Sequence, residues 1–147
     1  MKPWIQKAIE VLVYFHNSAG IVHNDGYFSI TVYGSDNKLL IANDKKIYDR
    51  TRYSSEQNAD GTYTYVISRE DPGVANWLDP CDMDEGMLTL RMAEFPDKRP
   101  NDDLSAQGEV MKLAELKSRL PEGTPWFTPA ERTQQQAERA AAYKRRL

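Results

Sequence analysis

The sequence predicts a mainly β protein: an antiparallel core of strands with one N-terminal helix and two C-terminal helices. Three observations support this fold class. Five segments between residues 27 and 92 have strand character and are joined by turn-forming residues with no helical stretch between them. Apolar residues before and after these segments recur at helical spacing instead. The 147 residues suffice for one domain with one core.

The N-terminal stretch is predicted to be an amphipathic helix of about three turns. Its apolar residues at helical spacing are Trp4, Ile5, Ala8, Ile9, Leu12 and Phe15. We interpret this helix as a cap on the core, because its polar face has too few bases for a membrane surface. Residues 11–15 form an apolar run far shorter than the ~20 residues of a membrane span. No small-residue cleavage pattern follows that run, so we expect neither a span nor a signal peptide.

The predicted strands are residues 27–33, 38–41, 47–53, 62–68 and 87–92. The first strand alternates apolar and hydroxyl side chains, and the fourth strand has the clearest alternation. The third strand is charged, which indicates a sheet edge. Turns are expected at residues 34–37 and 58–61, and Gly61 can adopt a positive φ in the second of them.

The C-terminal third is predicted to be a linker followed by two helices. Residues 96–108 are polar and expected to be irregular, and residues 109–120 carry a short apolar helical stripe that Pro121 ends. Thr128 as N-cap, Pro129 in the first helical position and Glu131 in a capping box predict a second helix that runs to Leu147. This helix has almost no large apolar face, so it frays, projects from the body or lies on another subunit.

Composition narrows the class of function. A net charge of −3 and a pI near 5.4 argue against a nucleic-acid binder. The charge is uneven: residues 69–103 contain ten acids and four bases, whereas residues 129–147 contain two acids and five bases. Cys81 is the one cysteine, which excludes an intramolecular disulfide and a multi-cysteine zinc site and favours a reducing, cytoplasmic compartment.

Residues 68–80 are the least generic run in the chain, with turn formers, a Trp, an amide and four charges close together. Trp77 and Asn76 allow two interpretations. In the structural one, which we favour, Trp77 buries the loop against the sheet and Asn76 bonds turn backbone. In the functional one, Trp77 is a platform for a sugar or another apolar ring, with Asn76 and Asp79 as polar partners.

Two arginines bear on the same loop. Arg69 or Arg91 paired with Asp71 or Asp79 would brace the loop, which is the interpretation we favour. An unpaired Arg in a cleft would instead indicate a ligand with a carboxylate or phosphate, because the guanidinium fork matches those groups.

Other candidate sites are weaker. The acidic residues Asp79, Asp82, Asp84 and Glu85 lack the further ligands of an EF-hand, so we predict a solvated loop and no metal site. His16 and His23 lie near the N-terminus, and Asp25 near the second could orient it as a general base. No activated nucleophile accompanies them, and Cys81 has no sign of activation. Without a Gly-rich phosphate loop or a His-x-x-x-His pair, no cofactor is predicted.

Three runs of this chain resemble an uncharacterised bacterial domain family, the domain of unknown function twelve-fourteen. They are residues 58–62 (NADGT), residues 71–79 (DPGVANWLD) and residues 86–91 (GMLTLR). The resemblance extends over residues 25–147 and implies a jelly-roll-like antiparallel β-sandwich that usually ends a longer protein. It brings no established activity and no catalytic residues. Five strands are few for a closed sandwich, which predicts either a shortened member or sheets completed by another chain.

These observations divide the chain into an N-terminal helix and linker (1–24), a β-sandwich core (25–96) and a linker with a helical extension (97–147). The predicted function is a non-catalytic ligand-binding or assembly module with a loop pocket around Trp77. Its predicted ligand-binding residues are Arg69, Asp71, Asn76, Trp77, Asp79 and Arg91. We expect a homo-oligomer or partner subunit through edge strands and the C-terminal helix, or a small-molecule ligand, and no nucleic acid or membrane.

The alternative is a small, hydrolase-like enzyme acting on a modest organic or sugar-like substrate. Asp71 or Asp79 with His23 would be its acid and base, and Arg91 its anion clamp. A carboxylate with a raised pKa in a closed pocket beside Trp77 would favour the enzyme, and a wholly buried Trp77 under a flat surface would favour the module.

Overall fold

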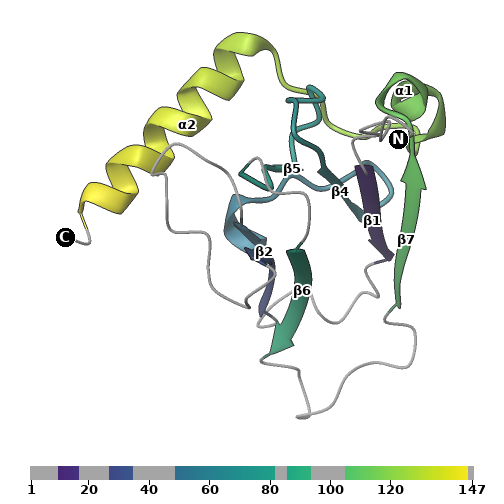
Figure 1. The fold of residues 1–147 in the computed structure, drawn as a ribbon, viewed down its shortest axis with the longest axis horizontal. Helices are drawn as coiled ribbons and strands as arrows, with labels where there is room; N and C mark the ends of the chain where they lie inside the picture. The colour runs from purple at the N-terminus through teal and green to yellow at the C-terminus, as the bar shows by residue number, and fades with distance from the viewer. Residues whose placement is uncertain (1–9, 17–26, 35–48, 82–85, 94–104, 146–147) are drawn as a thin grey trace, which may run out of the picture.

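The computed structural model describes residues 10–16, 27–34, 49–81, 86–93 and 105–145 (Figure 1). In this part of the chain most elements are strands, arranged in two small sheets. The four-stranded sheet has the order β5-β4-β1-β7. Its strands are β1 (Glu10–His16), β4 (Tyr63–Ile67), β5 (Trp77–Leu78) and β7 (Ser105–Met111).

The second sheet has three strands in the order β3-β2-β6. They are β2 (Tyr27–Gly34), β3 (Asp49–Thr51) and β6 (Gly86–Ala93), and all their pairings are antiparallel. In the four-stranded sheet the pairing of β4 with the two-residue strand β5 is parallel, whereas β1 pairs antiparallel with both neighbours. The antiparallel architecture predicted from the turns is therefore confirmed apart from this short pair.

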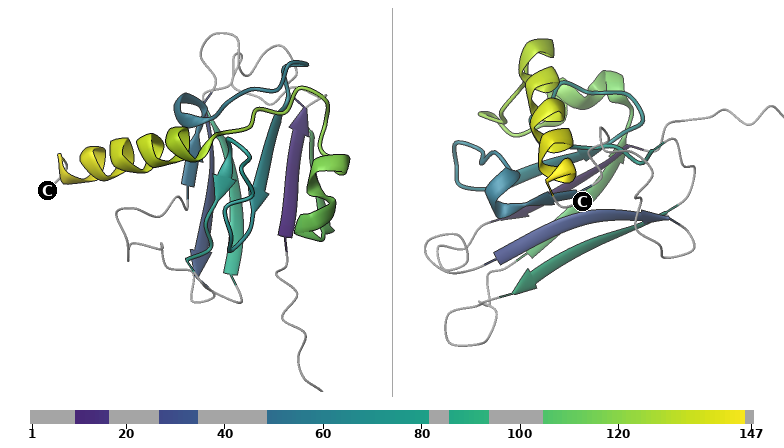
Figure 2. Two further views of the ribbon diagram at one scale, coloured as in Figure 1. Left: turned by 90° about the horizontal axis from the view of Figure 1, so that it is seen from above. Right: turned by 90° about the vertical axis from the view of Figure 1, so that its left-hand side faces the viewer.

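Side chains from both sheets form one hydrophobic cluster. Its buried members are Ile30, Val32, Tyr63, Tyr65 and Leu78, with Leu88, Leu90 and Met92 packed against them. The two sheets consequently lie as two layers with this cluster between them (Figure 2). The alternation along β2, β4 and β6 places these residues on one face of each strand, as a period of two requires.

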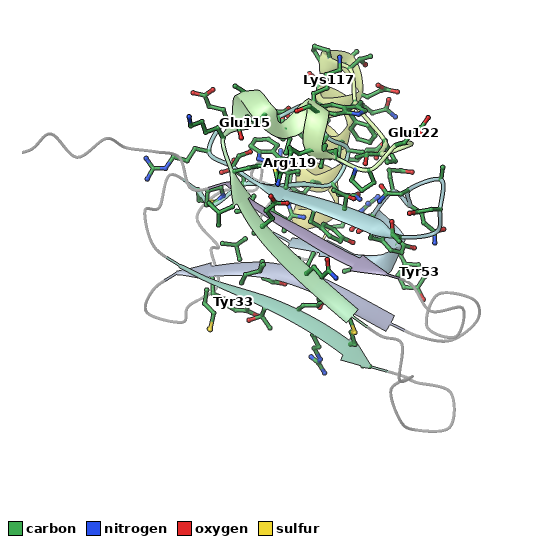
Figure 3. The ribbon with its side chains drawn as sticks, turned by 90° about the vertical axis from the view of Figure 1, so that its right-hand side faces the viewer. Tyr33, Tyr53, Glu115, Lys117, Arg119 and Glu122 are labelled. Atoms are coloured by element: carbon green, nitrogen blue, oxygen red, sulfur yellow. The ribbon has the colours of Figure 1, made fainter. Side chains whose placement is uncertain are left out.

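A second cluster lies on the opposite face of the four-stranded sheet. Val66 on β4, Met111 on β7, Val74 in the central loop and Leu116 in α1 (Leu116–Arg119) form it. Strand β4 is therefore covered on both faces, which explains why Tyr63 to Val66 are all buried. The 3-10 turn η3 (Leu113–Glu115) leads into α1, where Glu115 and Lys117 lie on the outer side (Figure 3) and Arg119 pairs with Glu109 on β7.

The predicted N-terminal helix is wrong for Glu10–His16, which form β1 in the centre of the four-stranded sheet. Residues 11–15 are β-branched, Leu and aromatic residues, and such residues favour strands. Pairing along β4 on one side and along β7 on the other decides the conformation, because a short apolar run by itself is compatible with helix or strand. Residues 4–9 lie outside the described part of the chain.

Other predictions for the strands and turns agree better with the structure. β3 lies at a sheet edge, as its charges indicated, although it spans only Asp49–Thr51 before the 3-10 turn η1 (Arg52–Ser54). The turn at residues 58–61 is confirmed: Gly61 has a φ of 87° and donates its N–H to the Asn58 carbonyl at 3.0 Å. The predicted strand at residues 38–41 lies outside the described residues.

The first C-terminal helix is shorter than predicted. Residues 105–108, expected to be irregular, and the beginning of the 109–120 stripe instead form β7, and helical backbone begins only at Leu113. The reason is tertiary: Ser105–Met111 pairs with β1 over its whole length.

The last helix, α2 (Pro129–Lys144), begins as predicted. Its capping box is present, because Thr128 Oγ1 accepts from the Glu131 N–H and the Glu131 carboxylate accepts from the Thr128 N–H at 2.7 Å. From its first turn the helix extends away from the two sheets (Figure 2).

Candidate functional site

The loop between β4 and β6 is joined to the segment that leads into α2. Val74 forms an isolated antiparallel bridge with Trp126, the Phe127 N–H donates to the Gly73 carbonyl at 2.8 Å, and the Ala75 N–H donates to the Pro125 carbonyl at 2.9 Å. Gly73 has a φ of 79°, and a Cβ at this position would approach the Trp126 ring to 3.6 Å. The central loop and the C-terminal segment therefore form one backbone ladder.

Asn76 holds a second segment against this loop. Its Oδ1 accepts the Glu56 N–H at 2.7 Å, and its Nδ2 donates to the carbonyls of Glu56 at 2.7 Å and Thr64 at 3.1 Å. The residue is 1 % exposed. Both ends of the amide thus bond backbone, as the structural interpretation of this residue expects.

Trp77 is buried beneath the loop rather than displayed on it. It is 5 % exposed, and its indole Nε1–H donates to the Ser68 carbonyl at 2.8 Å. Its backbone pairs with Val66 on β4. In this geometry the ring is not open to a solvent-borne sugar, and it contributes to the packing under the C-terminal segment.

Arg132, in the first turn of α2, is the residue that sequence reasoning missed. Its guanidinium carbon lies 5.3 Å from the ring centroid of Trp77 and 5.2 Å from that of Phe127. The same group donates to the backbone carbonyls of Val74 and Ala75. One feature of the sequence points to this role of Arg132. A cation near a helix N-terminus interacts unfavourably with the helix dipole, so an Arg at that position suggests a compensating partner elsewhere in the fold.

That partner is Asp71. Arg132 Nε donates to Asp71 Oδ2 at 2.8 Å and Nη2 donates to Asp71 Oδ1 at 3.2 Å, a bidentate pair. Asp71 Oδ1 also accepts the Gly73 N–H at 2.8 Å. An Arg therefore does brace Asp71, and it is Arg132 of α2, which the sequence analysis did not name.

The remaining predicted site residues lie farther from the Arg132–Asp71 pair in the loop or on the other sheet. Arg69 is half-buried at the end of β4, and Asp79 is buried with its Oδ1 accepting the Cys81 N–H at 2.7 Å. Arg91 is exposed on β6 of the other sheet, where its neighbours Leu90 and Met92 face the core. The fold thus brings together the loop residues 69–79 and leaves Arg91 on an outer face.

A groove of about 610 Å³ lies beside the Arg132 anchor. One wall is Tyr53, Ser54 and Glu56, the floor includes Phe127, and the other wall is the α2 face from Glu131 to Ala142. Tyr53 is 83 % exposed and lies at the surface (Figure 3). No motif in the sequence indicated this groove, because its two walls are separated by more than seventy positions. The Asn76 bonds to Glu56 and the ladder described above bring them together.

The groove is more acidic than basic. Glu56, Glu131 and Glu138 line it together with one base, Arg139. The pKa of Glu131 is lowered, first by the hydrogen bond from the Thr128 N–H and second by the bond from the Thr128 hydroxyl. Glu131 is therefore ionised at neutral pH and places a negative charge at the groove mouth and at the helix N-terminus.

Several other predicted features lie outside the described residues: His23, Asp25 and the acidic residues Asp82, Asp84 and Glu85. Cys81 is half-buried with a φ of 56°, and its backbone N–H is held by Asp79. Of the helices in the described ranges, none combines the length and the apolar character needed to cross a bilayer.

The chain is similar to several solved structures, two of which are described here. One is an uncharacterised protein from Burkholderia cenocepacia, with a TM-score of 0.54 and 22% identity over 74% of this chain and 28% of that chain. The other is a protein from Vibrio parahaemolyticus, with a TM-score of 0.50 and 21% identity over 72% of this chain and 26% of that chain. These similarities concern the fold alone, and the chain spans about a quarter of the length of both proteins.

No curated protein matches the chain. A family model described as "Protein of unknown function (DUF1214)" matches residues 15–97, more than half of the sequence and including the loop centred on Trp77. This match confirms the resemblance inferred from the NADGT, DPGVANWLD and GMLTLR runs. The chain belongs to the DUF1214 family.

Proposed function

We propose that this chain is a non-catalytic binding or assembly module. In this proposal the loop 69–79 holds the first turn of α2, and the groove between α2 and η1 is the binding surface. The proposed site residues differ in role. Asp71, Asn76 and Trp77 hold the helix and the loop together, and Arg69 and Asp79 lie at the two ends of the loop.

One observation carries the proposal: the Arg132 anchor. A buried guanidinium held by Asp71, two backbone carbonyls and two aromatic rings fixes the first turn of α2. The following turns bound an open groove instead of packing on a core. A helix held firmly at one end and open along its length is suited to receive another molecule.

The geometry gives the enzymatic alternative less support. Asp71 accepts from Arg132 with both carboxylate oxygens, so it is engaged in structure. Arg91, the proposed anion clamp, is on the outer face of the other sheet. We therefore keep the module as the proposal.

The same proposal includes the jelly-roll-like β-sandwich implied by the family resemblance. Two antiparallel sheets that share a core cluster support it. The edges β7 and β6 are the places where another strand would extend the sheets.

The test is a thermal-shift ligand screen with two matched variants of α2. Ala142 lines the groove, so Ala142→Trp fills it, whereas Ala141 is exposed beside it and Ala141→Trp leaves it open. We expect wild type and Ala141→Trp to be stabilised by the same compounds, or by increasing protein concentration, and Ala142→Trp to lose that stabilisation. Equal behaviour of the two Trp variants would place binding elsewhere and contradict the proposal.

A further inference from the structure

The turns of helix α2 after the first contribute little to the core. Among the residues from Thr133 to Arg145 whose side chains are described, none is buried. Two of their hydrogen bonds lie within the helix: Gln134 donates to Glu138 at 2.8 Å and Thr133 donates to the Pro129 carbonyl at 2.9 Å. Isolated helices of about this length are marginal in water, so a partner along these turns would stabilise α2.

The positions of α2 that line the groove define which face would be covered. Gln135, Arg139 and Ala142 follow Arg132 at helical spacing and all three line the groove. The face is polar at its start and ends in a small residue, with the Phe127 and Tyr53 rings beside it. This face therefore suits a polar helix that approaches closely at Ala142.

The charges along α2 are segregated. After Glu138 the sequence contains Arg139, Lys144, Arg145 and Arg146 and no acid. The acidic part of the groove, with Glu56 and Glu131, lies at the other end of the helix. The basic end of one helix is thus complementary to the acidic end of another that runs in the opposite direction.

We infer that the groove receives α2 of a second copy of this chain, in an antiparallel pair around a twofold axis between Glu138 and Arg139. Glu138 then meets the partner's Arg139 and Arg139 meets the partner's Glu138, as an isologous interface requires. Gln135 faces the partner's Ala142, where a methyl side chain permits close approach of the helices. A parallel pair would instead oppose Glu138 to the partner's Glu138, so like charges disfavour it.

This inference rests on the proposed function, because it names the occupant of the proposed groove. Its test is the mass of the full chain by sedimentation equilibrium over a range of protein and salt concentrations. We expect a dimer with twice the 16.9 kDa mass of the chain. Its dissociation constant should rise at high salt, because salt screens the charge pairs. Wild type that stays at 16.9 kDa at every concentration overturns the inference.

Charge reversal identifies the pairing. In Glu138→Arg or Arg139→Glu, two attractive contacts become repulsive, and we expect the dissociation constant to rise about tenfold. The double variant Glu138→Arg with Arg139→Glu exchanges the two charges and is expected to restore wild-type association. The antiparallel arrangement is overturned if the single reversals leave the dissociation constant unchanged. It is also overturned if the double reversal does not restore the wild-type dissociation constant.

The two proposals fail differently. A monomeric wild type whose ligand-induced stabilisation is lost in Ala142→Trp contradicts the second copy and keeps the groove as a binding site. A dimer that is insensitive to Ala142→Trp forms through another surface and contradicts the second copy in the groove. Equal ligand-induced stabilisation of Ala141→Trp and Ala142→Trp contradicts the groove as a binding site.

Discussion

Arg132 and Asp71 lie 61 positions apart in the sequence and form the ion pair that attaches the C-terminal helix to the central loop. The Arg132 side chain is 6 % exposed and the Asp71 side chain 35 % exposed. Their contact brings a charge of the basic tail into the acidic part of the chain. It also determines where the groove lies.

Replacing Arg132 by Ala is expected to lower the free energy of unfolding by about 3 kcal/mol, because it leaves Asp71 and two backbone carbonyls without their donor. Arg132→Lys should recover little, since an ammonium cannot reproduce the bidentate fork. Urea denaturation measures both. Lys117→Ala, which removes an exposed charge on α1, is the control and should change stability by less than about 0.5 kcal/mol. Equal effects at the two positions would contradict the anchor.

Asn76→Ala is expected to destabilise the protein by about 3 kcal/mol, because two backbone groups of Glu56 and the Thr64 carbonyl lose their partner. Gln57→Ala is the matched control: its exposed amide makes one bond, to the Gly61 carbonyl, and should cost about 0.5 kcal/mol. Thermal unfolding compares the two. A melting temperature of Asn76→Ala close to wild type would restore the interpretation of Asn76 as a ligand contact.

The capping box predicts a pH dependence. Because folding lowers the pKa of Glu131 below its ordinary value of 4.5, its contribution is present above that value and is lost as the pH falls through the folded-state pKa. Wild type should therefore be more stable than Glu131→Gln at pH 7, and the difference should shrink in acid. Denaturation at a series of pH values measures it. Thr128→Val, which removes one of the two donors, should reduce the difference, and Thr128→Ser should retain it.

Substitutions at Gly123 test the close contact between the C-terminal segment and the turn at residues 58–61. A Cβ at Gly123 would lie 2.7 Å from Ala59 Cβ, and its φ is 80°. Gly61 has a φ of 87° with its nearest neighbour at 3.7 Å, so Gly61→Ala carries only the backbone strain, about 1–2 kcal/mol.

Gly123→Ala should lower the free energy of unfolding by about 1 kcal/mol or more beyond the loss caused by Gly61→Ala, because overpacking adds to the backbone strain. Ala59→Gly combined with Gly123→Ala should remove most of this excess. Equal losses for the two single variants would mean that the close contact has no energetic weight. Chemical denaturation of the four proteins decides.

Local patterns were enough for much of the fold. Alternation identified β2, β4 and β6, turn chemistry identified the turn at Gly61, and the capping residues located the start of α2. The unusual composition of residues 68–80 located the central loop and the family. Each of these depends on residues within a few positions of one another, which a sequence displays directly.

Partners distant in the chain decided the rest. Residues 10–16 became β1 because β4 and β7 pair with them on both sides, and residues 105–108 became part of β7 for the same reason. Arg132 became the anchor because a backbone ladder brings residues 125–127 to residues 73–75. Local sequence therefore determined the strands, turns and caps, whereas tertiary pairing decided the sheet order, the salt bridge and the groove, because hydrogen-bond partners far apart in the chain leave no periodic trace in it.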